Sequence, residues 1–243
     1  MGNSRIKWRL QQPDGDSAPQ SGSAASVVEL IDSLESMPQP GLVRLASVRA
    51  DASVAEFASW AESRWSLKPR IATVSSNCGG VRNAYSDVSR MGVDRWLAML
   101  AAYGEIRSAC LVIDGGTAFT LDLIDTDGQH LGGYILPGLS LMASALEENT
   151  AIRLQSVDTE ISVQPGSITE AAVRNGSLAS VIALIEKNLS QLQQRGGEVC
   201  VLIGGGDAPL LAKALAAEGM ADVRIRPNLV LDGLPIACGE AGE

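Results

Sequence analysis

Three short loops of small residues could bind an anion through their main-chain N–H groups. They are GNS at 2–4, DGGTA at 114–118 and GGGD at 204–207. Such loops leave N–H groups free to point at phosphate oxygens, and the first two also contain a hydroxyl that can donate. Asp114 could hold the cation that neutralises phosphate charge. Any one loop alone would more often be a simple turn, but the three together favour a phosphate site.

A second group of polar residues, in the segment GVDR, could bind and activate an alcohol. Asp94 could accept a proton from a hydroxyl, and Arg95 could bind a carboxylate with both arms of its guanidinium. Tyr85 could line the same pocket, and Gly92 would let a substrate approach the main chain. A helix is expected to begin here, so the alternative is that Asp94 only caps it. With the phosphate loops, these residues supply what phosphoryl transfer needs: held phosphates, a cation and an oriented hydroxyl.

Strand-like and helix-like segments alternate in both halves of the chain, and the glycine loops follow strands. The runs 109–114, 119–125 and 130–136 are joined by short turns, which predicts an antiparallel meander. The sequence therefore predicts an α/β protein of two lobes, residues 1–105 and 106–243. A cleft between such lobes is a natural ligand site.

Helix starts are indicated by two capping-box patterns, Ser53 with Glu56 and Ser167 with Glu170. The second opens a long helix that is expected to end at about residue 194. Segment 11–26 is rich in Ser, Gly and Pro and predicts a loop. The other expected strands are 6–10, 42–48, 70–76, 198–203 and 223–227, and the other expected helices are 26–37, 93–104, 139–148 and 209–219.

Composition argues against several classes of protein. A net charge of -9 disfavours binding to nucleic acid or to an anionic membrane, and no apolar run approaches the roughly 20 residues of a membrane span. The four cysteines form no CxxC pair; Cys110 and Cys200 are expected in the core, and a cytoplasmic location with reduced thiols is expected. No P-loop occurs, and Pro209 breaks a dinucleotide fingerprint. His130, the one histidine, is expected half exposed on a strand rather than in a catalytic triad.

Several motifs together resemble the type III pantothenate kinases, a family that also includes the Bvg accessory factors. The motifs occur in the family's order and are GNSRIKW, NAY, MGVDRW, IDGGTAFTLDLID, GGYILPGLSLM and PGSITEA. The resemblance covers most of the chain and is weakest over 11–75 and after 210. It implies the two-lobed, ribonuclease H-like fold of the actin-like ATPase superfamily, with mixed sheets flanked by helices.

The resemblance also implies a reaction and a set of roles. The enzyme would transfer the γ-phosphate of ATP to the terminal hydroxyl of pantothenate, the first step of coenzyme A synthesis, and would act as a homodimer with the substrate site at the dimer interface. Asp94 would be the general base. Asp114 would bind a monovalent cation, K⁺ or NH₄⁺, and Mg²⁺ would accompany ATP. The pantothenate contacts would be Tyr85, Gly92, Val93, Asp94, Arg95 and Thr169, and the ATP contacts Gly2, Asn3, Ser4, Lys7 and Thr117.

One departure from the family concerns the first motif. The family begins with a short apolar strand that ends in Asp-x-Gly-Asn, whereas here Met1 stands directly before Gly2. We expect that the recorded start is later than the true one; the alternative is a shortened chain without activity, such as a non-catalytic regulator or binding protein. A kinase for another small acid is disfavoured by GVDR and Tyr85. The second residue of DGGTA is glycine where leucine is usual, and a modest effect is expected.

Overall fold

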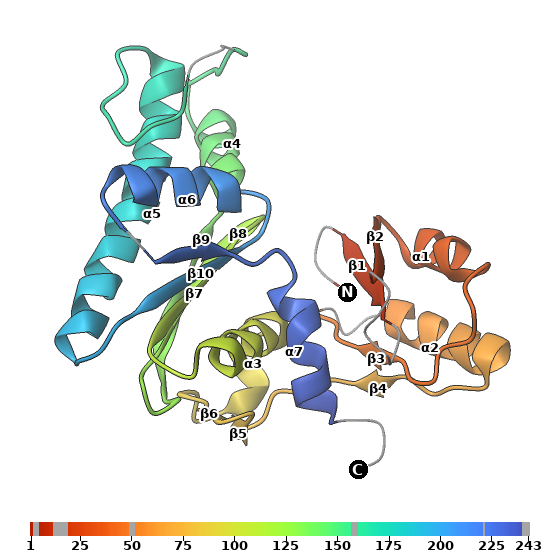
Figure 1. Cartoon of the computed structure of the whole chain (residues 1–243). Helices are drawn as coiled ribbons and strands as arrows, with labels where there is room; N and C mark the ends of the chain where they lie inside the picture. Colours follow the sequence, from red (N-terminus) through yellow and green to blue (C-terminus); the bar gives the residue numbers. More distant parts are fainter. Residues whose placement is uncertain (2–4, 12–18, 49–51, 157–159, 221, 240–243) are drawn as a thin grey trace. The chain divides into compact units, whose positions relative to one another are not determined.

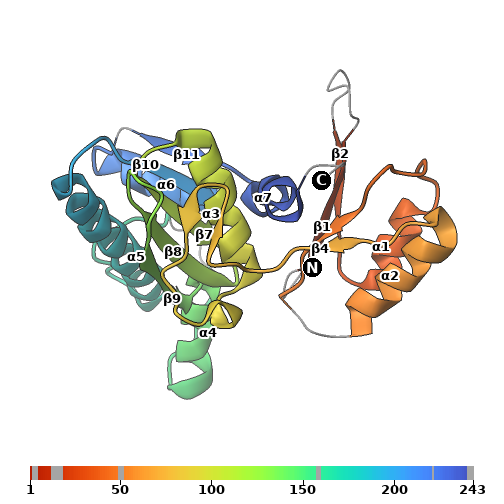
Figure 2. The same cartoon turned by 90° about the horizontal axis from the view of Figure 1, so that it is seen from below.

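The computed structural model describes residues 1, 5–11, 19–48, 52–156, 160–220 and 222–239. They form two compact units (Figures 1 and 2). The first comprises Met1–Gly79, Tyr85–Ala101 and Leu229–Glu243, and the second comprises Gly80–Ala84 and Ala102–Asn228. The division into domains at 105/106 stays a prediction.

A five-stranded mixed sheet forms the centre of the second unit. Its strands lie in the order β11-β10-β7-β8-β9; β7, β8 and β9 form an antiparallel meander, and β10 and β11 run parallel to β7. This is the strand arrangement of the ribonuclease H-like fold, so the predicted fold class and meander are confirmed. The strands are β7 Cys110–Gly115, β8 Ala118–Ile124, β9 His130–Pro137, β10 Cys200–Gly204 and β11 Val223–Ile225.

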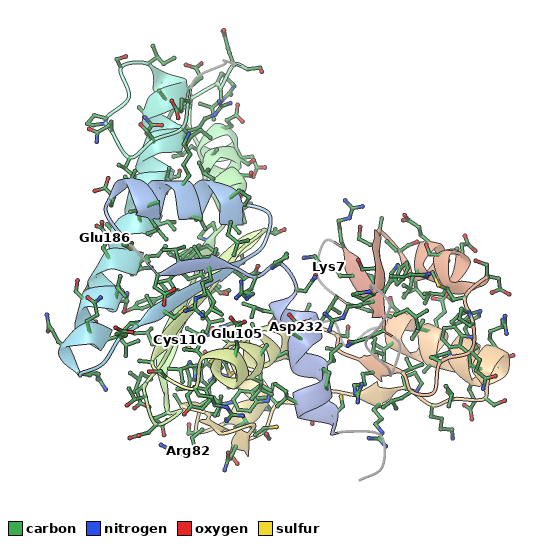
Figure 3. All side chains as sticks on the ribbon, in the orientation of Figure 1. Lys7, Arg82, Glu105, Cys110, Glu186 and Asp232 are labelled. Atoms are coloured by element: carbon green, nitrogen blue, oxygen red, sulfur yellow. The ribbon has the colours of Figure 1, made fainter. Side chains whose placement is uncertain are left out.

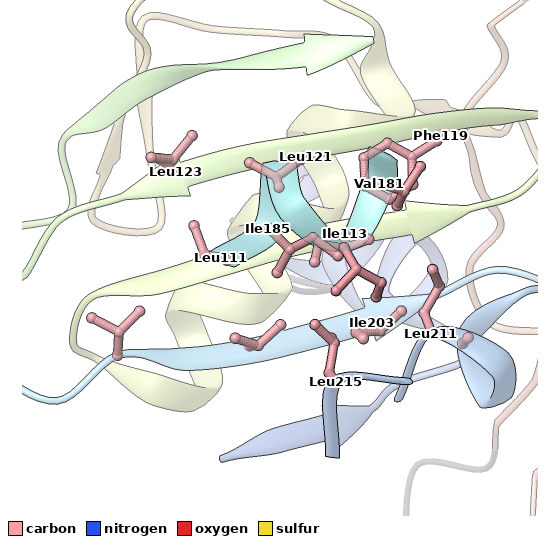
Figure 4. Packing of buried hydrophobic residues seen from close by; sticks show 14 of the residues in the cluster. Leu111, Ile113, Phe119, Leu121, Leu123, Val181, Ile185, Ile203, Leu211 and Leu215 are labelled. Atoms are coloured by element: carbon pink, nitrogen blue, oxygen red, sulfur yellow. The ribbon is translucent and has the colours of Figure 1, made fainter. Parts of the chain in front are cut away.

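Alternating residues of this sheet build its core on one face (Figure 4). Leu111 and Ile113 of β7, Leu121 of β8 and Ile203 of β10 are all at most 1% exposed. They pack against apolar side chains of α5 (Thr169–Gln194) and α6 (Ala208–Ala217). Each such side chain contributes about 1.5–3 kcal/mol when it leaves water. The helix α4 (Leu139–Asn149) packs against α5 and β9.

The first unit contains two separate pairs of strands with helices beside them. β1 (Ile6–Leu10) pairs antiparallel with β2 (Gln20–Ala24), and β3 (Arg44–Leu45) pairs parallel with β4 (Arg70–Ile71). Beyond β3, the main chain of Met1 bonds with Ala46 and Val48. The unit's other elements are α1 Val27–Leu34, α2 Ala52–Trp65, β5 Asn77–Cys78, η1 Val88–Arg90, α7 Leu229–Cys238 and most of α3 Val93–Ile106, while β6 Val81–Arg82 belongs to the second unit.

Two predictions about local structure in the first unit were wrong. Residues 20–24 form β2, although 11–26 was expected to be a loop. The strand is encoded by small polar residues, and Gly22 matters because a Cβ there would come within 2.7 Å of the Trp8 indole on the paired strand. The strands predicted over 42–48 and 70–76 are only two residues each in β3 and β4.

Both predicted helix starts are confirmed, although neither serine is the residue directly before its helix. The helix α2 begins at Ala52, so Ser53 lies within its first turn. The helix α5 begins at Thr169 after Ile168, with no capping bond from a side chain. The Glu170 carboxylate instead accepts a hydrogen bond from the Gln155 N–H at 3.2 Å. In α5 the segment before the helix, rather than the serine of the pattern, therefore supplies the donor to this carboxylate.

Candidate functional site

Asp94 stands in the first turn of α3, where Gly92 allows an unusually close approach. The carbonyl of Gly92 accepts the first helical hydrogen bond, from the Trp96 N–H at 3.1 Å. Oδ1 of Asp94 accepts from the Arg95 N–H at 2.8 Å, and a Cβ on Gly92 would lie 2.6 Å from this oxygen. Asp94 therefore does help to satisfy the start of the helix, as the capping alternative supposed. Its side chain is half-buried, so it also remains within reach of a ligand.

Arg95 is buried beside Tyr85. The arginine is 6% exposed, and its Nη1 donates to the Tyr85 hydroxyl at 3.1 Å. The guanidinium carbon lies 5.8 Å from the centre of the tyrosine ring, within the range of a cation–π interaction. A buried guanidinium with a fixed orientation is suited to bind a carboxylate with two parallel hydrogen bonds. The structure thus brings Tyr85, Gly92, Val93, Asp94 and Arg95 into one short region of the first unit.

In the second unit, Asp114 lies at the end of β7, where glycines surround its carboxylate. It pairs in register with Thr120 of β8 on one side and with Gly204 of β10 on the other. A Cβ on Gly205 would come within 2.6 Å of Asp114 Oδ1, and Cβ atoms on Gly116 and Gly204 would come within 3.6 and 3.7 Å of the carboxylate. Asp114 is nevertheless exposed. This space could receive a cation or a phosphate oxygen.

Two further loops pack onto the DGGTA loop through the main chain. The N–H of Asp207 donates to the Gly115 carbonyl at 2.9 Å, and the N–H of Gly138 donates to the Thr117 carbonyl at 2.9 Å. A Cβ on Gly138 would collide with the Gly116 carbonyl. The Pro-Gly turn of the GGYILPG motif therefore serves close packing.

Asp207 was absent from the predicted site residues, although the GGGD pattern that contains it was recognised as an anion loop. Its main chain is bonded to the loop of Asp114. Burial raises the pKa of the Asp207 carboxyl above its usual range. Carboxyl groups with shifted pKa values occur frequently at functional sites, so Asp207 joins Gly204 and Gly205 as a candidate nucleotide contact.

The residues available for a metal ion are few. Within the described part of the chain, no group of three or more His, Cys, Asp or Glu side chains is arranged to hold one. Asp114 is a single carboxylate in a glycine-lined space. This fits Mg²⁺, which is commonly bound through one or two carboxylates and the phosphates of the substrate, and it equally fits a monovalent cation with oxygen ligands.

Thr169 and Lys7 stand on other elements of the two units. Thr169 is the exposed first residue of α5. The segment before it is held by Asn175, whose amide accepts from the Ser162 N–H at 3.2 Å and donates to the Gln164 carbonyl at 2.8 Å. Lys7 of β1 pairs with Ser23 of β2, and its side chain is exposed (Figure 3). The predicted ATP contacts Gly2, Asn3 and Ser4 lie outside the described residues.

Comparison with known proteins identifies the family. The family model for type III pantothenate kinase matches residues 1–191. The chain belongs to the type III pantothenate kinase family. It is 38% identical to the type III pantothenate kinase of Pseudomonas aeruginosa (strain LESB58) over 247 residues, which covers 98% of this chain and 96% of that protein. The enzyme of Ectopseudomonas mendocina (strain ymp), also named type III pantothenate kinase, is 38% identical over 249 residues with the same coverage.

A solved structure agrees with the fold. A protein of Campylobacter jejuni described as a Baf family transcriptional activator superposes with a TM-score of 0.56 at 18% identity, covering 96% of this chain and 92% of that one. At this identity the likeness concerns the fold alone. In the part of the chain that the structure describes, no helix is long and apolar enough to span a membrane.

Proposed function

We propose that this chain phosphorylates pantothenate with ATP, using Asp94 as the general base and Asp114 as the ligand of a cation at the phosphates. The observation that carries the proposal is the family match over residues 1–191, within which both carboxylates stand in glycine-lined places. The reaction is the first step of coenzyme A biosynthesis. Its product is 4′-phosphopantothenate.

Asp94 acts on the hydroxyl of pantothenate. Its carboxylate accepts the hydroxyl proton as the oxygen forms a bond to the γ-phosphorus, while the bond from that phosphorus to the bridging oxygen of ADP breaks. One oxygen, Oδ1, already accepts from the Arg95 N–H, which fixes the carboxylate's orientation at the start of α3. The protein's part in such a transfer is chiefly positioning and charge stabilisation.

The acid group of pantothenate is bound by Arg95. The guanidinium is held against Tyr85 by a hydrogen bond and by the tyrosine ring, so little side-chain freedom remains to be lost on binding. Gly92 and Val93 contact the substrate through the main chain, and Thr169 supplies a hydroxyl from the start of α5. This role of Thr169 is proposed from its place in the family's motif PGSITEA.

ATP binds to the second group of residues. Thr117 and the segment Gly2, Asn3, Ser4 and Lys7 contact the nucleotide. Asp114 holds a cation, and we propose a monovalent ion, K⁺ or NH₄⁺, at this position, with Mg²⁺ accompanying ATP. When bound, these ions neutralise the charge that develops on the phosphate oxygens.

A second copy of the chain completes the enzyme as a homodimer. Large apolar side chains are exposed on neighbouring elements of the second unit: Tyr134 and Ile135 on β9, Leu141 and Leu146 on α4, and Ile168 before α5. Apolar groups of this kind are typical of surfaces that bind a partner. We propose that the dimer covers them and that it works in the cytoplasm. Replacing Ile135 by Glu should then shift the mass measured by light scattering toward that of a monomer.

The proposed reaction is tested directly with purified protein. The chain is incubated with ATP, Mg²⁺, K⁺ and pantothenate, and 4′-phosphopantothenate is measured by mass spectrometry. Product is expected with pantothenate and is not expected when pantothenate is omitted. ATP consumption without that product, or no reaction by folded protein, would contradict the proposal.

A further inference from the structure

The second unit contains a buried histidine–aspartate pair that the reaction does not use directly. His130 of β9 and Asp122 of β8 are 1% and 2% exposed, and the Nε2 of His130 lies 3.0 Å from Oδ1 of Asp122. The prediction of a half-exposed histidine was therefore wrong. Burial is possible because both ring nitrogens have partners: Nδ1 accepts a hydrogen bond from the Ala84 N–H at 3.3 Å.

These contacts define the form of the imidazole. An N–H that points at Nδ1 requires a lone pair there, so the ring proton is on Nε2 and is donated to Asp122. His130 pairs in register with Ile124 beside an irregularity of the β8–β9 ladder. Asp122, two residues from Ile124, is its diagonal neighbour on the same side of the sheet. The hydrogen bond between His130 and Asp122 therefore depends on this register of β8 and β9.

Hydrogen bonds attach residues 80–84 to neighbouring segments of the second unit, and the bond to His130 is the last of them along the chain. The N–H of Arg82 donates to the Gly128 carbonyl at 2.9 Å, and the side chain of Gln129 bonds with both the side chain and the carbonyl of Arg82, at 3.2 and 3.3 Å. The Arg82 side chain itself is exposed (Figure 3). The N–H of Ala84 is then held by the buried side chain of His130. The next residue along the chain is Tyr85.

We infer that His130, oriented by Asp122, is a positioning residue for the pantothenate site: it fixes the main chain at Ala84 and thereby places Tyr85, which holds Arg95. The inference rests on the proposed role of Tyr85 and Arg95 in binding pantothenate. Loss of the acceptor at Nδ1 would release the N–H of Ala84, the residue directly before Tyr85, and would place the Tyr85 hydroxyl less well for its 3.1 Å bond with Arg95. The consequence would be weaker pantothenate binding with ATP binding unchanged.

The alternative is that the pair only stabilises the fold. A buried pair that loses one partner leaves the other unsatisfied, which destabilises any protein wherever the pair lies. Stability alone therefore cannot separate the two roles. Two substitutions of His130 can, because each keeps one of the two hydrogen bonds.

His130→Asn places an amide oxygen near the position of Nδ1, so it keeps the acceptor for Ala84 and gives up Asp122. His130→Gln places an amide N–H near the position of Nε2, so it keeps the donor to Asp122 and gives up Ala84. Both should lower the melting temperature. We expect the pantothenate KM to rise about tenfold in His130→Gln, the usual scale for one lost hydrogen bond, with the ATP KM unchanged. His130→Asn should restore the pantothenate KM to within about threefold of the natural protein.

Because the chain has one histidine, nitrogen NMR of the labelled protein reads this ring without assignment of other signals. The expected result is an unprotonated Nδ1 and a protonated Nε2. The opposite tautomer, or equal pantothenate KM values in the Gln and Asn variants, would overturn the inference. Tyr85→Phe is measured alongside. If Tyr85→Phe leaves the pantothenate KM unchanged, Tyr85 is not part of the pantothenate site, and both the proposed site and the positioning role of His130 are contradicted. If Tyr85→Phe raises the pantothenate KM while His130→Gln does not, only the positioning role of His130 is contradicted.

Discussion

A Cβ atom on Gly92 would lie 2.6 Å from Oδ1 of Asp94, so the carboxylate occupies the space that a side chain at position 92 would take. We therefore expect Gly92→Ala to displace the carboxylate while the helix still forms. A shift of about 1 Å in a reacting group can cost about 10²-fold in rate, and kcat should fall by up to that factor. The measurement is steady-state kinetics with both substrates varied.

Gly41→Ala is the matched control for this substitution. It lies in the same unit, and a Cβ there would meet nothing within 4 Å. Its kcat should equal that of the natural protein. Equal kcat in Gly92→Ala as well would mean that the carboxylate tolerates displacement, which is incompatible with a role in proton transfer.

The glycine-lined space around the Asp114 carboxylate predicts that substitutions of two adjacent glycines, Gly205 and Gly206, have different effects on ATP binding. Gly205 has a φ of +87°, and its Cβ would collide with the Gly115 carbonyl and approach Asp114 Oδ1 to 2.6 Å, whereas a Cβ on Gly206 would meet nothing within 4 Å. Gly205→Ala should raise the KM for ATP by about tenfold or more through displacement of Asp114, since strain of this kind costs about 1–3 kcal/mol. Gly206→Ala should leave it unchanged. A similar KM for ATP in both variants would place nucleotide binding elsewhere.

Arg95 predicts a substrate-specific effect. Lysine keeps the charge but lacks the planar fork that binds a carboxylate with two hydrogen bonds. Arg95→Lys should raise the pantothenate KM by about 10–100-fold, corresponding to a hydrogen bond between charged groups, and should leave the KM for ATP near its natural value. Arg90→Lys, at an exposed arginine of η1, is the control. An equal rise in both KM values would indicate general damage instead of lost carboxylate binding.

Asp207 predicts a dependence of stability on pH. Burial raises its pKa in the folded protein, so the folded state prefers the protonated carboxyl. The stability that the protonated Asp207 carboxyl contributes is fully present at pH values below the ordinary pKa of an aspartate. It is lost as the pH rises through the raised pKa of the folded state. Asp207→Asn, which stays uncharged, should therefore be more stable than the natural protein at neutral pH. The gain should be below about 1 kcal/mol because the side chain is partly exposed and screened.

Urea unfolding at neutral pH and near pH about 4, where an ordinary Asp titrates, measures this effect. The stability difference should shrink in acid. Glu198→Gln removes the same charge from an exposed position and should show little change at either pH. A stability loss in Asp207→Asn at neutral pH would mean that the carboxylate makes favourable contacts that outweigh its burial.

Much of the second unit could be predicted from the sequence. The antiparallel meander is encoded by short turns between apolar runs, and β10 by an unbroken apolar run, so these strands formed as predicted. The strand β2 could not be predicted, because its stability comes from pairing with β1 and from the contact of Gly22 with Trp8.

The candidate site was predicted in part. The residue types of GVDR and DGGTA indicated the chemistry, and the structure groups the members of each motif. The packing of the GGGD loop against the DGGTA loop depends on which strands are neighbours, and β7 and β10 are far apart in the chain. His130 was misjudged because its partners, Asp122 and the Ala84 N–H, are not visible in a pattern of polarity.

In the proposed reaction, Asp94 removes the proton from the hydroxyl of pantothenate. The most direct test of this role is kcat of Asp94→Asn at saturating ATP and pantothenate, with Asp87→Asn, a cap of η1, as the control for a lost carboxylate nearby. We predict a folded protein with kcat lowered by about 10²-fold or more, as loss of a general base typically causes, and a control with natural kcat. A folded Asp94→Asn variant that makes 4′-phosphopantothenate at nearly the natural rate would contradict the account.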